Sequence, residues 1–194
     1  MCIRDSYKAP VKDIVFGYEV IDSYNVLNKI SAFSDFSEDI VIPTMEECAK
    51  FSEEVLAPIN AIGDQQGATI KDGVVTMPEE FVDAYQKFAE AGWASISLPS
   101  DIGGGGMPIT LSGGTLEILS TANLAFGLAP GLSAGAISAI NFHGSQEQKD
   151  KFLPKLVSGE WTGTMNLSEP QSGSDLGTIT TKAEPQEDGS YKIT

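Results

Sequence analysis

The sequence predicts a mainly α-helical protein with a small β part near its C-terminal end. Apolar residues recur at spacings of three and four through residues 37–62, which is the period of one helix face. Residues 110–142 are apolar nearly all round and rich in small side chains, as expected for the centre of a helical bundle. Short β-compatible runs bounded by Pro and Gly occur in one early hairpin and again after residue 160.

The composition is that of a globular protein in water. Of the 194 residues, 41% are hydrophobic, which is enough for a sizeable core in one or two domains. Asp and Glu number 27 against 12 Lys and Arg, and the net charge of −15 disfavours nucleic acid and anionic lipid as partners. No uninterrupted apolar run approaches the ~20 residues of a membrane span, and the two cysteines form no disulfide framework, so we expect a cytoplasmic protein.

Both ends of the chain indicate a fragment of a longer protein. Residues 1–6 have no periodic pattern and resemble translated adapter sequence, so we treat them as a non-native leader. The chain stops inside a β-compatible run at residues 191–194. Residues 7–34 combine a Pro-stiffened segment with an apolar patch and predict an N-terminal extension packed on the body of the protein.

Residues 37–62 form the first long predicted helix. Pro58 should kink this helix because proline removes a hydrogen bond to the preceding turn. Cys48 lies in the apolar stripe, and we interpret it as a small core residue rather than a redox group.

A β-hairpin and a second helix follow. Asp72-Gly73 predicts a tight turn between two short strands. Thr76 and Glu79 have the spacing of a capping box, in which both side chains satisfy free backbone N–H groups at the start of a helix. Gly92 is expected to end this helix. The apolar stripe of this helix, three of whose four members are aromatic, predicts core packing, and it consists of Phe81, Ala84, Tyr85 and Phe88.

Four consecutive glycines at residues 103–106 raise the question of a nucleotide-binding loop. No Lys-Ser or Lys-Thr pair follows them as in a P-loop, and the flanking residues do not fit a dinucleotide fingerprint. The glycines therefore predict a loop with unusual backbone angles.

Two further helical regions precede the β part. Gly127 and Pro130 are expected to break residues 110–142 into two buried helices. His143, the single histidine, is expected to cap a helix or face solvent rather than act in acid–base chemistry. Ser145 and Gln148 form a second predicted capping box, which starts a helix that ends near Pro154.

The stretch with the most chemical information is residues 161–182. A β-compatible run at 161–167 is broken at Pro170 and another begins at Thr178, which predicts a strand, a wide loop and a strand. Such a loop can direct backbone N–H groups and serine hydroxyls to one point, which suits a planar heteroaromatic ring or a phosphate ester. Composition alone favours an ordinary polar loop and implies no metal or nucleophile. The three hydroxyls are those of Ser168, Ser172 and Ser174.

The order of residues in this loop resembles a known signature. Residues 165–175, Met-Asn-Leu-Ser-Glu-Pro-Gln-Ser-Gly-Ser-Asp, are similar to the flavin-binding motif of the acyl-CoA dehydrogenases, Thr-Glu-Pro-x-Ala-Gly-Ser-Asp. Ser168 stands where Thr is usual and keeps its hydroxyl, and Ser172 replaces Ala. The resemblance continues in order from about residue 7 to residue 194. Residues 7–18 resemble the larger bacterial subgroup that includes the 3-methylmercaptopropionyl-CoA dehydrogenases.

This resemblance implies a fold and a domain organisation. Residues 35–158 would form the all-α N-terminal domain of an acyl-CoA dehydrogenase, and residues 159–194 would begin its antiparallel β middle domain. The implied cofactor is FAD, and Ser174 would also contact the acyl-CoA substrate. The implied flavin contacts are Met165, Asn166, Leu167, Ser168, Glu169, Pro170, Gln171, Ser172, Gly173 and Ser174.

The resemblance also implies an activity in fatty acid metabolism. The family oxidises an acyl-CoA thioester to the trans-2-enoyl-CoA and passes electrons to an electron-transfer flavoprotein, and the full-length enzyme would be a homo-oligomer. No catalytic base is assigned to this chain, because the family carries it in a C-terminal helical domain. Glu169 beside Pro170 is interpreted as loop support. Two alternatives stay open: an acyl-CoA oxidase, and a non-catalytic helical interaction module of the same fold without flavin.

Overall fold

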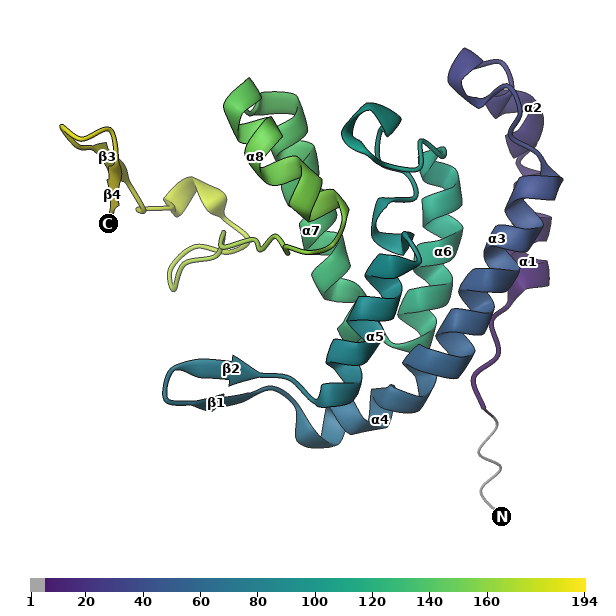
Figure 1. The fold of residues 1–194 in the computed structure, drawn as a ribbon, viewed down its shortest axis with the longest axis horizontal. Helices are drawn as coiled ribbons and strands as arrows, with labels where there is room; N and C mark the ends of the chain where they lie inside the picture. Colours follow the sequence, from purple (N-terminus) through teal and green to yellow (C-terminus); the bar gives the residue numbers. More distant parts are fainter. Residues whose placement is uncertain (1–5) are drawn as a thin grey trace. The chain divides into compact units, whose positions relative to one another are not determined.

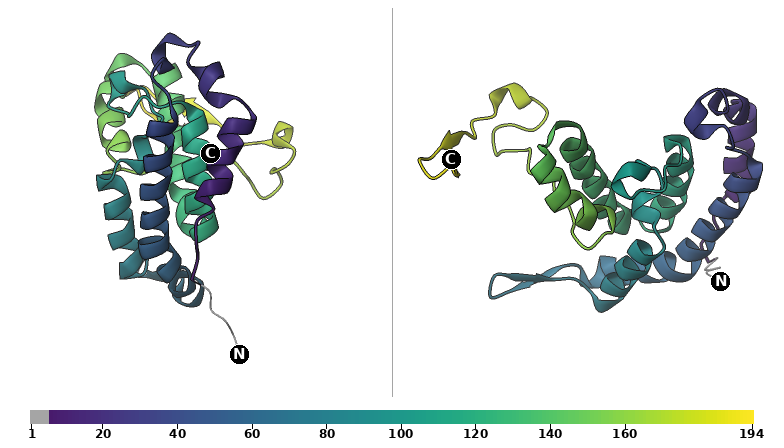
Figure 2. Two further views of the ribbon diagram at one scale, coloured as in Figure 1. Left: turned by 90° about the vertical axis from the view of Figure 1, so that its right-hand side faces the viewer. Right: turned by 45° about the horizontal axis from the view of Figure 1, so that its top comes forward.

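The computed structural model describes residues 6–194, which form a mainly helical fold with two antiparallel β-hairpins (Figures 1 and 2). The expected leader lies outside the described residues apart from Ser6. The described residues divide into two compact units, one that ends at Thr164 and a second that comprises Met165–Thr194. The α-helices are α1 (Val11–Val20), α2 (Ser23–Leu27), α3 (Glu38–Phe51), α4 (Ala57–Gln66), α5 (Glu79–Glu90), α6 (Ile109–Ala122), α7 (Leu124–His143) and α8 (Gln146–Val157). The strands are β1 (Thr69–Lys71), β2 (Val74–Thr76), β3 (Ala183–Pro185) and β4 (Tyr191–Ile193).

The core of the first unit lies between α3 and α6, which run side by side (Figure 1). Met45 and Cys48 of α3 are fully buried, as is Ile118 of α6. The aromatic stripe of α5 completes this core as predicted, since Phe81 and Phe88 are buried and pack around Phe126 of α7. Cys48 is therefore confirmed as a core residue.

The N-terminal extension packs on the helices, as predicted. The Tyr7 hydroxyl donates to the carbonyl of Ile118 on α6 at 3.0 Å. Helix α1 buries Ile14, Val15 and Tyr18, and the Tyr18 hydroxyl donates to the Thr110 carbonyl at 2.5 Å. Burial raises the pKa of the Tyr18 phenol to about 12, so this hydrogen-bond donor keeps its proton.

The disturbance predicted at Pro58 takes the form of a π-helical turn. Residues Ser52–Leu56 form this turn between α3 and α4, and Pro58 lies in the first turn of α4. Proline has no N–H to donate, and a wider turn before it accommodates the missing hydrogen bond. The predicted long helix is thus three consecutive helical segments.

The predicted hairpin is present and extends away from the helices (Figure 2). Asp72 and Gly73 have φ angles of 52° and 79°, and positive φ at both turn positions is the requirement of a type I′ turn. The capping box predicted from Thr76 is wrong. Thr76 pairs with Thr69 in the hairpin, and α5 begins after Pro78 without a side-chain cap.

The four-glycine loop has the unusual backbone angles that were predicted. Gly103 and Gly106 have φ angles of 92° and 67°. Gly104 and Gly105 instead lie against the backbone of Leu98 and Ile96, where a Cβ atom would clash. The N–H groups of Gly104, Gly105 and Gly106 donate to carbonyls of residues 95–99, so the loop folds back on its own entry segment.

The break between α6 and α7 lies at Asn123, and the prediction of breaks at Gly127 and Pro130 is wrong. The Asn123 side chain accepts a hydrogen bond from the Phe126 N–H at 3.1 Å and caps α7, which continues through both residues. A side-chain cap stabilises a helix start at the position where the chain turns. Gly92, by contrast, follows the end of α5 with a φ of 76°, as predicted.

Helix α7 is less buried than predicted. Leu124 and Leu128 are each 61% exposed, and Phe142 is 78% exposed. Among residues 6–194 it is the one helix long and apolar enough to cross a membrane by length and composition, with a mean hydropathy of 1.4. A core helix of a soluble protein meets the same criterion, so the expected absence of a membrane span stays a prediction. His143 ends the helix and is exposed, as expected.

Helix α8 begins at the predicted capping box. The Ser145 hydroxyl accepts from the Gln148 N–H at 3.3 Å, and the Gln148 side chain accepts from the Ser145 N–H at 2.8 Å. The helix continues past Pro154 to Val157, three residues beyond the predicted end.

Candidate functional site

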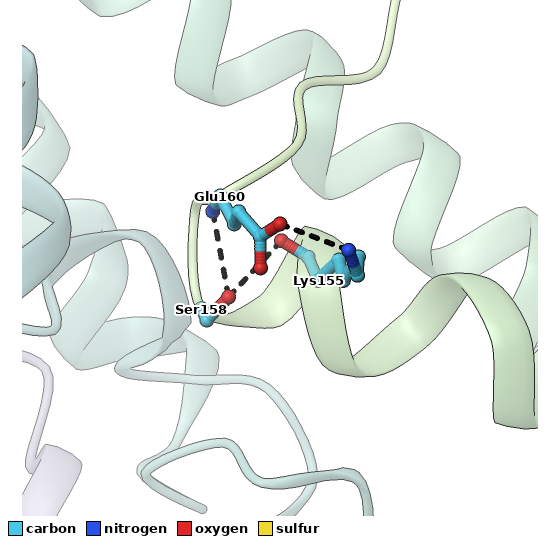
Figure 3. Close-up of polar contacts among 3 residues, drawn as sticks. All are labelled: Lys155, Ser158 and Glu160. Carbon is cyan, nitrogen blue, oxygen red and sulfur yellow. Dashed lines mark hydrogen bonds and ion pairs between the residues drawn. The ribbon is translucent and has the colours of Figure 1, made fainter.

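The connector between α8 and the candidate loop is fixed by polar contacts within the first unit. Lys155 forms an ion pair with Glu160 at 2.9 Å, and the Glu160 N–H donates to the Ser158 hydroxyl at 3.4 Å (Figure 3). The Lys155 ammonium also lies 4.6 Å from the centre of the Trp161 ring. Two residues further on, the Gly163 N–H donates to the Ser133 hydroxyl of α7 at 3.1 Å. These contacts therefore hold the connector against the first unit as far as Gly163.

The candidate loop itself lies in the second unit. The strand predicted at residues 161–167 is absent, because these residues have no strand partner among residues 6–194. A β-strand needs neighbouring backbone groups to satisfy its N–H and C=O groups. The second predicted run starts later than expected, since Leu176–Thr178 is a 3₁₀ turn and β3 begins at Ala183.

The predicted wide loop contains a tight turn around Pro170. The Glu169 N–H donates to the Ser172 carbonyl at 2.7 Å, and the Ser172 N–H donates to the Glu169 carbonyl at 3.0 Å. Pro170 and Gln171 occupy the two central positions, where the fixed φ of proline favours a turn. The signature is thus a two-residue reversal followed by the exposed segment from Gly173 to Asp175.

The three serine hydroxyls have different environments. Ser172 is 2% exposed, and its hydroxyl donates to the Asp175 carbonyl at 2.7 Å. Ser168 and Ser174 are exposed. The hydroxyl of Ser168 lies beside Gly173, 3.9 Å from the position that a Cβ atom would take there. The inclusion of Ser172 in the flavin-contacting run stays a prediction.

The carboxylate of Glu169 accepts several hydrogen bonds from Thr180 and Thr181. Its Oε1 accepts from the Thr181 N–H at 2.9 Å, and its Oε2 accepts from the Thr180 N–H at 2.9 Å and the Thr180 hydroxyl at 3.0 Å. The Gln171 side-chain amide also donates to Oε2. Hydrogen bonds from Thr181 and Thr180 lower the pKa of Glu169 to about 2, because they stabilise the charged form. This carboxylate is a structural acceptor, as the sequence indicated, and a poor general base.

Part of the loop remains available to a ligand. Within the residues that the structure describes, the N–H groups of Gly173 and Ser174 donate no hydrogen bond. Met165 is 64% exposed and Leu167 is 43% exposed. Neighbouring free amides can hold an acceptor atom, and exposed apolar side chains can cover the face of a ring. Across residues 6–194, no three His, Cys, Asp or Glu side chains gather as metal ligands.

Sequence reasoning missed Thr180 and Thr181 as parts of the site. They lie eleven and twelve residues after Glu169, and their type and spacing match no ligand motif. Only the folding back of the chain after the 3₁₀ turn brings their N–H groups to the carboxylate.

Comparison with known proteins decides the family. The model of the acyl-CoA dehydrogenase N-terminal domain matches residues 43–160, which is more than half of the chain. The chain belongs to the acyl-CoA dehydrogenase family. The 3-methylmercaptopropionyl-CoA dehydrogenase of Ruegeria pomeroyi is 41% identical over 188 residues, which cover 97% of this chain and 32% of that protein. A butyryl-CoA dehydrogenase of Syntrophomonas wolfei is 34% identical over 195 residues, which cover 98% of this chain and 32% of that protein.

Solved structures of the acyl-CoA dehydrogenase family share the fold. An acyl-CoA dehydrogenase from Bacillus anthracis, complexed with FAD, matches with a TM-score of 0.68 and 25% identity over 82% of this chain and 26% of its own. A butyryl-CoA dehydrogenase from Megasphaera elsdenii matches with the same TM-score at 24% identity, over 82% of this chain and 40% of its own. The mainly helical fold class and the family resemblance are therefore confirmed. The chain spans about a third of the length of the two curated relatives.

Proposed function

We propose that this chain is the N-terminal part of an FAD-dependent acyl-CoA dehydrogenase and that residues 165–174 form its flavin loop. The observation that carries the proposal is that some polar groups of the loop form internal hydrogen bonds whereas others do not. Glu169 and Ser172 are occupied by internal hydrogen bonds, whereas the Ser168 hydroxyl and the N–H groups of Gly173 and Ser174 make no hydrogen bond within residues 6–194. The relation to named acyl-CoA dehydrogenases supports the same assignment.

The free groups fit the chemistry of a flavin ring. An isoalloxazine carries carbonyl oxygens and ring nitrogens along one edge, which require hydrogen-bond donors. Gly173, Ser174 and Ser168 supply such donors, and Met165 and Leu167 supply apolar surface for the face of the ring. These residues would bind and orient FAD and exclude water from its edge. Bound FAD would supply the acceptor for a hydride from the β-carbon of the substrate.

The proposed substrate is an acyl-CoA thioester, and the proposed product is the trans-2-enoyl-CoA. Ser174 would contact the acyl-CoA from the exposed side of the loop. Removal of the α-proton requires a carboxylate within hydrogen-bond reach of it, and we assign that base to a C-terminal helical domain rather than to Glu169. We further propose an electron-transfer flavoprotein as acceptor, a homo-oligomeric enzyme and a cytoplasmic location. A solved structure of the electron transferring flavoprotein of Acidaminococcus fermentans, which matches 82% of this chain and 39% of its own with a TM-score of 0.68 and 26% identity, supports the proposed acceptor.

Expression of the protein with its downstream coding sequence tests the proposal. We expect a yellow protein with a flavin absorption spectrum that bleaches under anaerobic addition of an acyl-CoA, with butyryl-CoA and 3-methylmercaptopropionyl-CoA as the first substrates tried. A colourless protein would contradict the proposal and favour a non-catalytic helical module. Formation of hydrogen peroxide in stoichiometric amounts in air would indicate an acyl-CoA oxidase.

The 194-residue chain provides a second measurement. We expect it neither to retain FAD through gel filtration nor to turn over substrate, because no catalytic base is assigned to it and, among residues 6–194, residues 165–182 belong to neither of the two β-hairpins. Retained flavin together with turnover would show that this expectation is wrong.

A further inference from the structure

Glu169 connects the two halves of the second unit's loop. On one side it forms the tight turn with Ser172 through two backbone hydrogen bonds. On the other side its carboxylate accepts from the backbone N–H groups of Thr180 and Thr181, both at 2.9 Å, and from the Thr180 hydroxyl at 3.0 Å. One side chain therefore joins the start of the signature to the segment that follows it.

The residues proposed to meet the flavin flank this connection. Ser168 directly precedes Glu169, and Gly173 directly follows Ser172. Ser172 is itself held by the turn and by its hydroxyl bond to the Asp175 carbonyl at 2.7 Å. The free donors thus lie on a segment whose backbone is held at residues 169–172 by the turn and at residues 180–181 by the Glu169 carboxylate.

We propose that Glu169 is the positioning residue of this loop: its carboxylate holds residues 168–174 in the flavin-binding shape before the cofactor arrives and makes no contact with the flavin. The inference rests on the proposed function, because it assigns a task within that site. It differs from the family resemblance, which places Glu169 among the flavin contacts.

The charge and both oxygens are required for this role. The two oxygens accept from four donors, and a neutral amide of the same shape offers one oxygen and places an NH₂ group against the remaining N–H donors. Glu169→Gln therefore changes the hydrogen bonding without changing the volume. Glu187→Gln is the matched control, since Glu187 is exposed in the same unit and its side chain makes no hydrogen bond within residues 6–194.

The first measurement reads the loop without flavin. In ¹H–¹⁵N spectra of the 194-residue chain, we expect Glu169→Gln to move the amide signals of Thr180 and Thr181 upfield. Their exchange with water should become about tenfold faster, because amides that lose a charged acceptor open more easily. Glu187→Gln should leave both signals in place. Unchanged Thr180 and Thr181 signals in Glu169→Gln would overturn the inference.

The second measurement reads flavin binding in the full-length protein. We expect Glu169→Gln to raise the dissociation constant of FAD about tenfold, since the loop must then be ordered at the expense of binding free energy. Thr180→Val, which removes one hydroxyl donor, should raise the dissociation constant of FAD by less than Glu169→Gln does. Thr180→Ser keeps the hydroxyl and should keep the wild-type affinity for FAD. Altered amide signals with unchanged FAD affinity would overturn the positioning role.

The two measurements separate the inference from the proposed function. If the wild-type full-length protein binds no FAD while the amide signals respond to Glu169→Gln, the flavin assignment is wrong and the positioning role falls with it. If the wild-type protein binds FAD but Glu169→Gln changes neither measurement, the proposed function stands and the role of Glu169 is refuted.

Discussion

Gly104→Ala should destabilise the protein strongly. A Cβ atom at this position would lie 2.2 Å from the carbonyl oxygen and 2.4 Å from the carbonyl carbon of Leu98, both of which are backbone atoms. The backbone must move by about 1 Å to restore a normal contact, and overpacking of this kind costs about 3 kcal/mol. The movement would also disturb the Gly106 N–H bond to the Leu98 carbonyl, which is 2.9 Å long.

Gly113→Ala is the matched control, with the opposite expected sign. Gly113 is a helical residue of α6, and apart from its chain neighbours and the nearby backbone of its own helix no atom lies within 4 Å of the position that a Cβ atom would take there. Alanine has the better helix propensity and reduces the entropy of the unfolded chain, so the variant should gain about 0.5–1 kcal/mol. Both substitutions add the same methyl group, and only the folded surroundings differ.

Thermal unfolding followed by circular dichroism at 222 nm provides the assay. For a protein of this size, ~1 kcal/mol corresponds to a shift of roughly 2–4 °C in Tm, so Gly104→Ala should unfold roughly 6–12 °C below the wild type. Gly113→Ala should unfold about 1–4 °C above it. Equal shifts for the two variants, or a Gly104→Ala protein as stable as the wild type, would refute this account of the loop.

Three other predictions concern the first unit. Asn123→Ala should cost about 2–3 kcal/mol in urea unfolding, because it removes both the α7 cap and the buried side-chain hydrogen bond to the Leu56 carbonyl at 3.2 Å; an unchanged free energy of unfolding would contradict this. Burial raises the pKa of the Cys48 thiol to about 12, so in a Cys2→Ser background a thiol reagent at pH 8 should label the protein only on addition of denaturant, and rapid native labelling would contradict the burial. Hydrogen bonds from Lys8 and the Ala9 N–H lower the pKa of Glu53 below 4.5, so its contribution to stability is present above pH 4.5 and is lost as the pH falls through the lowered value. Glu53→Gln should therefore reduce the loss of folding free energy below pH 4.5. An equal loss in the variant and the wild type would contradict this.

Much of the helical fold could be predicted because local patterns carry it. The aromatic residues of α5 recur with helical spacing and are buried, and the Ser145 capping box starts α8 where the sequence places it. The break at Asn123 was missed because its cap depends on one side-chain geometry, whereas Pro130 and Gly127 are tolerated within a helix that packs on its neighbours. The expected burial of α7 was wrong for a related reason: apolar composition does not say which surface is covered.

The candidate site also has features that the sequence predicted and features that it did not. The motif at residues 165–175 marked the candidate loop and its family through its resemblance to a known signature, and the Pro at its centre favours the turn that the structure has there. The direction of each hydroxyl was beyond the sequence: Ser172 turns inward, and Ser168 and Ser174 remain exposed.

By itself, the sequence determined the helical periods, the type I′ turn at Asp72-Gly73 and the loop motif, because each depends on the backbone preferences of neighbouring residues. The tertiary structure alone decided that Gly104 must lack a side chain and that the Glu169 carboxylate accepts hydrogen bonds from the N–H groups of Thr180 and Thr181. Steric contacts and hydrogen bonds between residues that are distant in sequence depend on which segments the fold brings together, and local sequence patterns do not specify this.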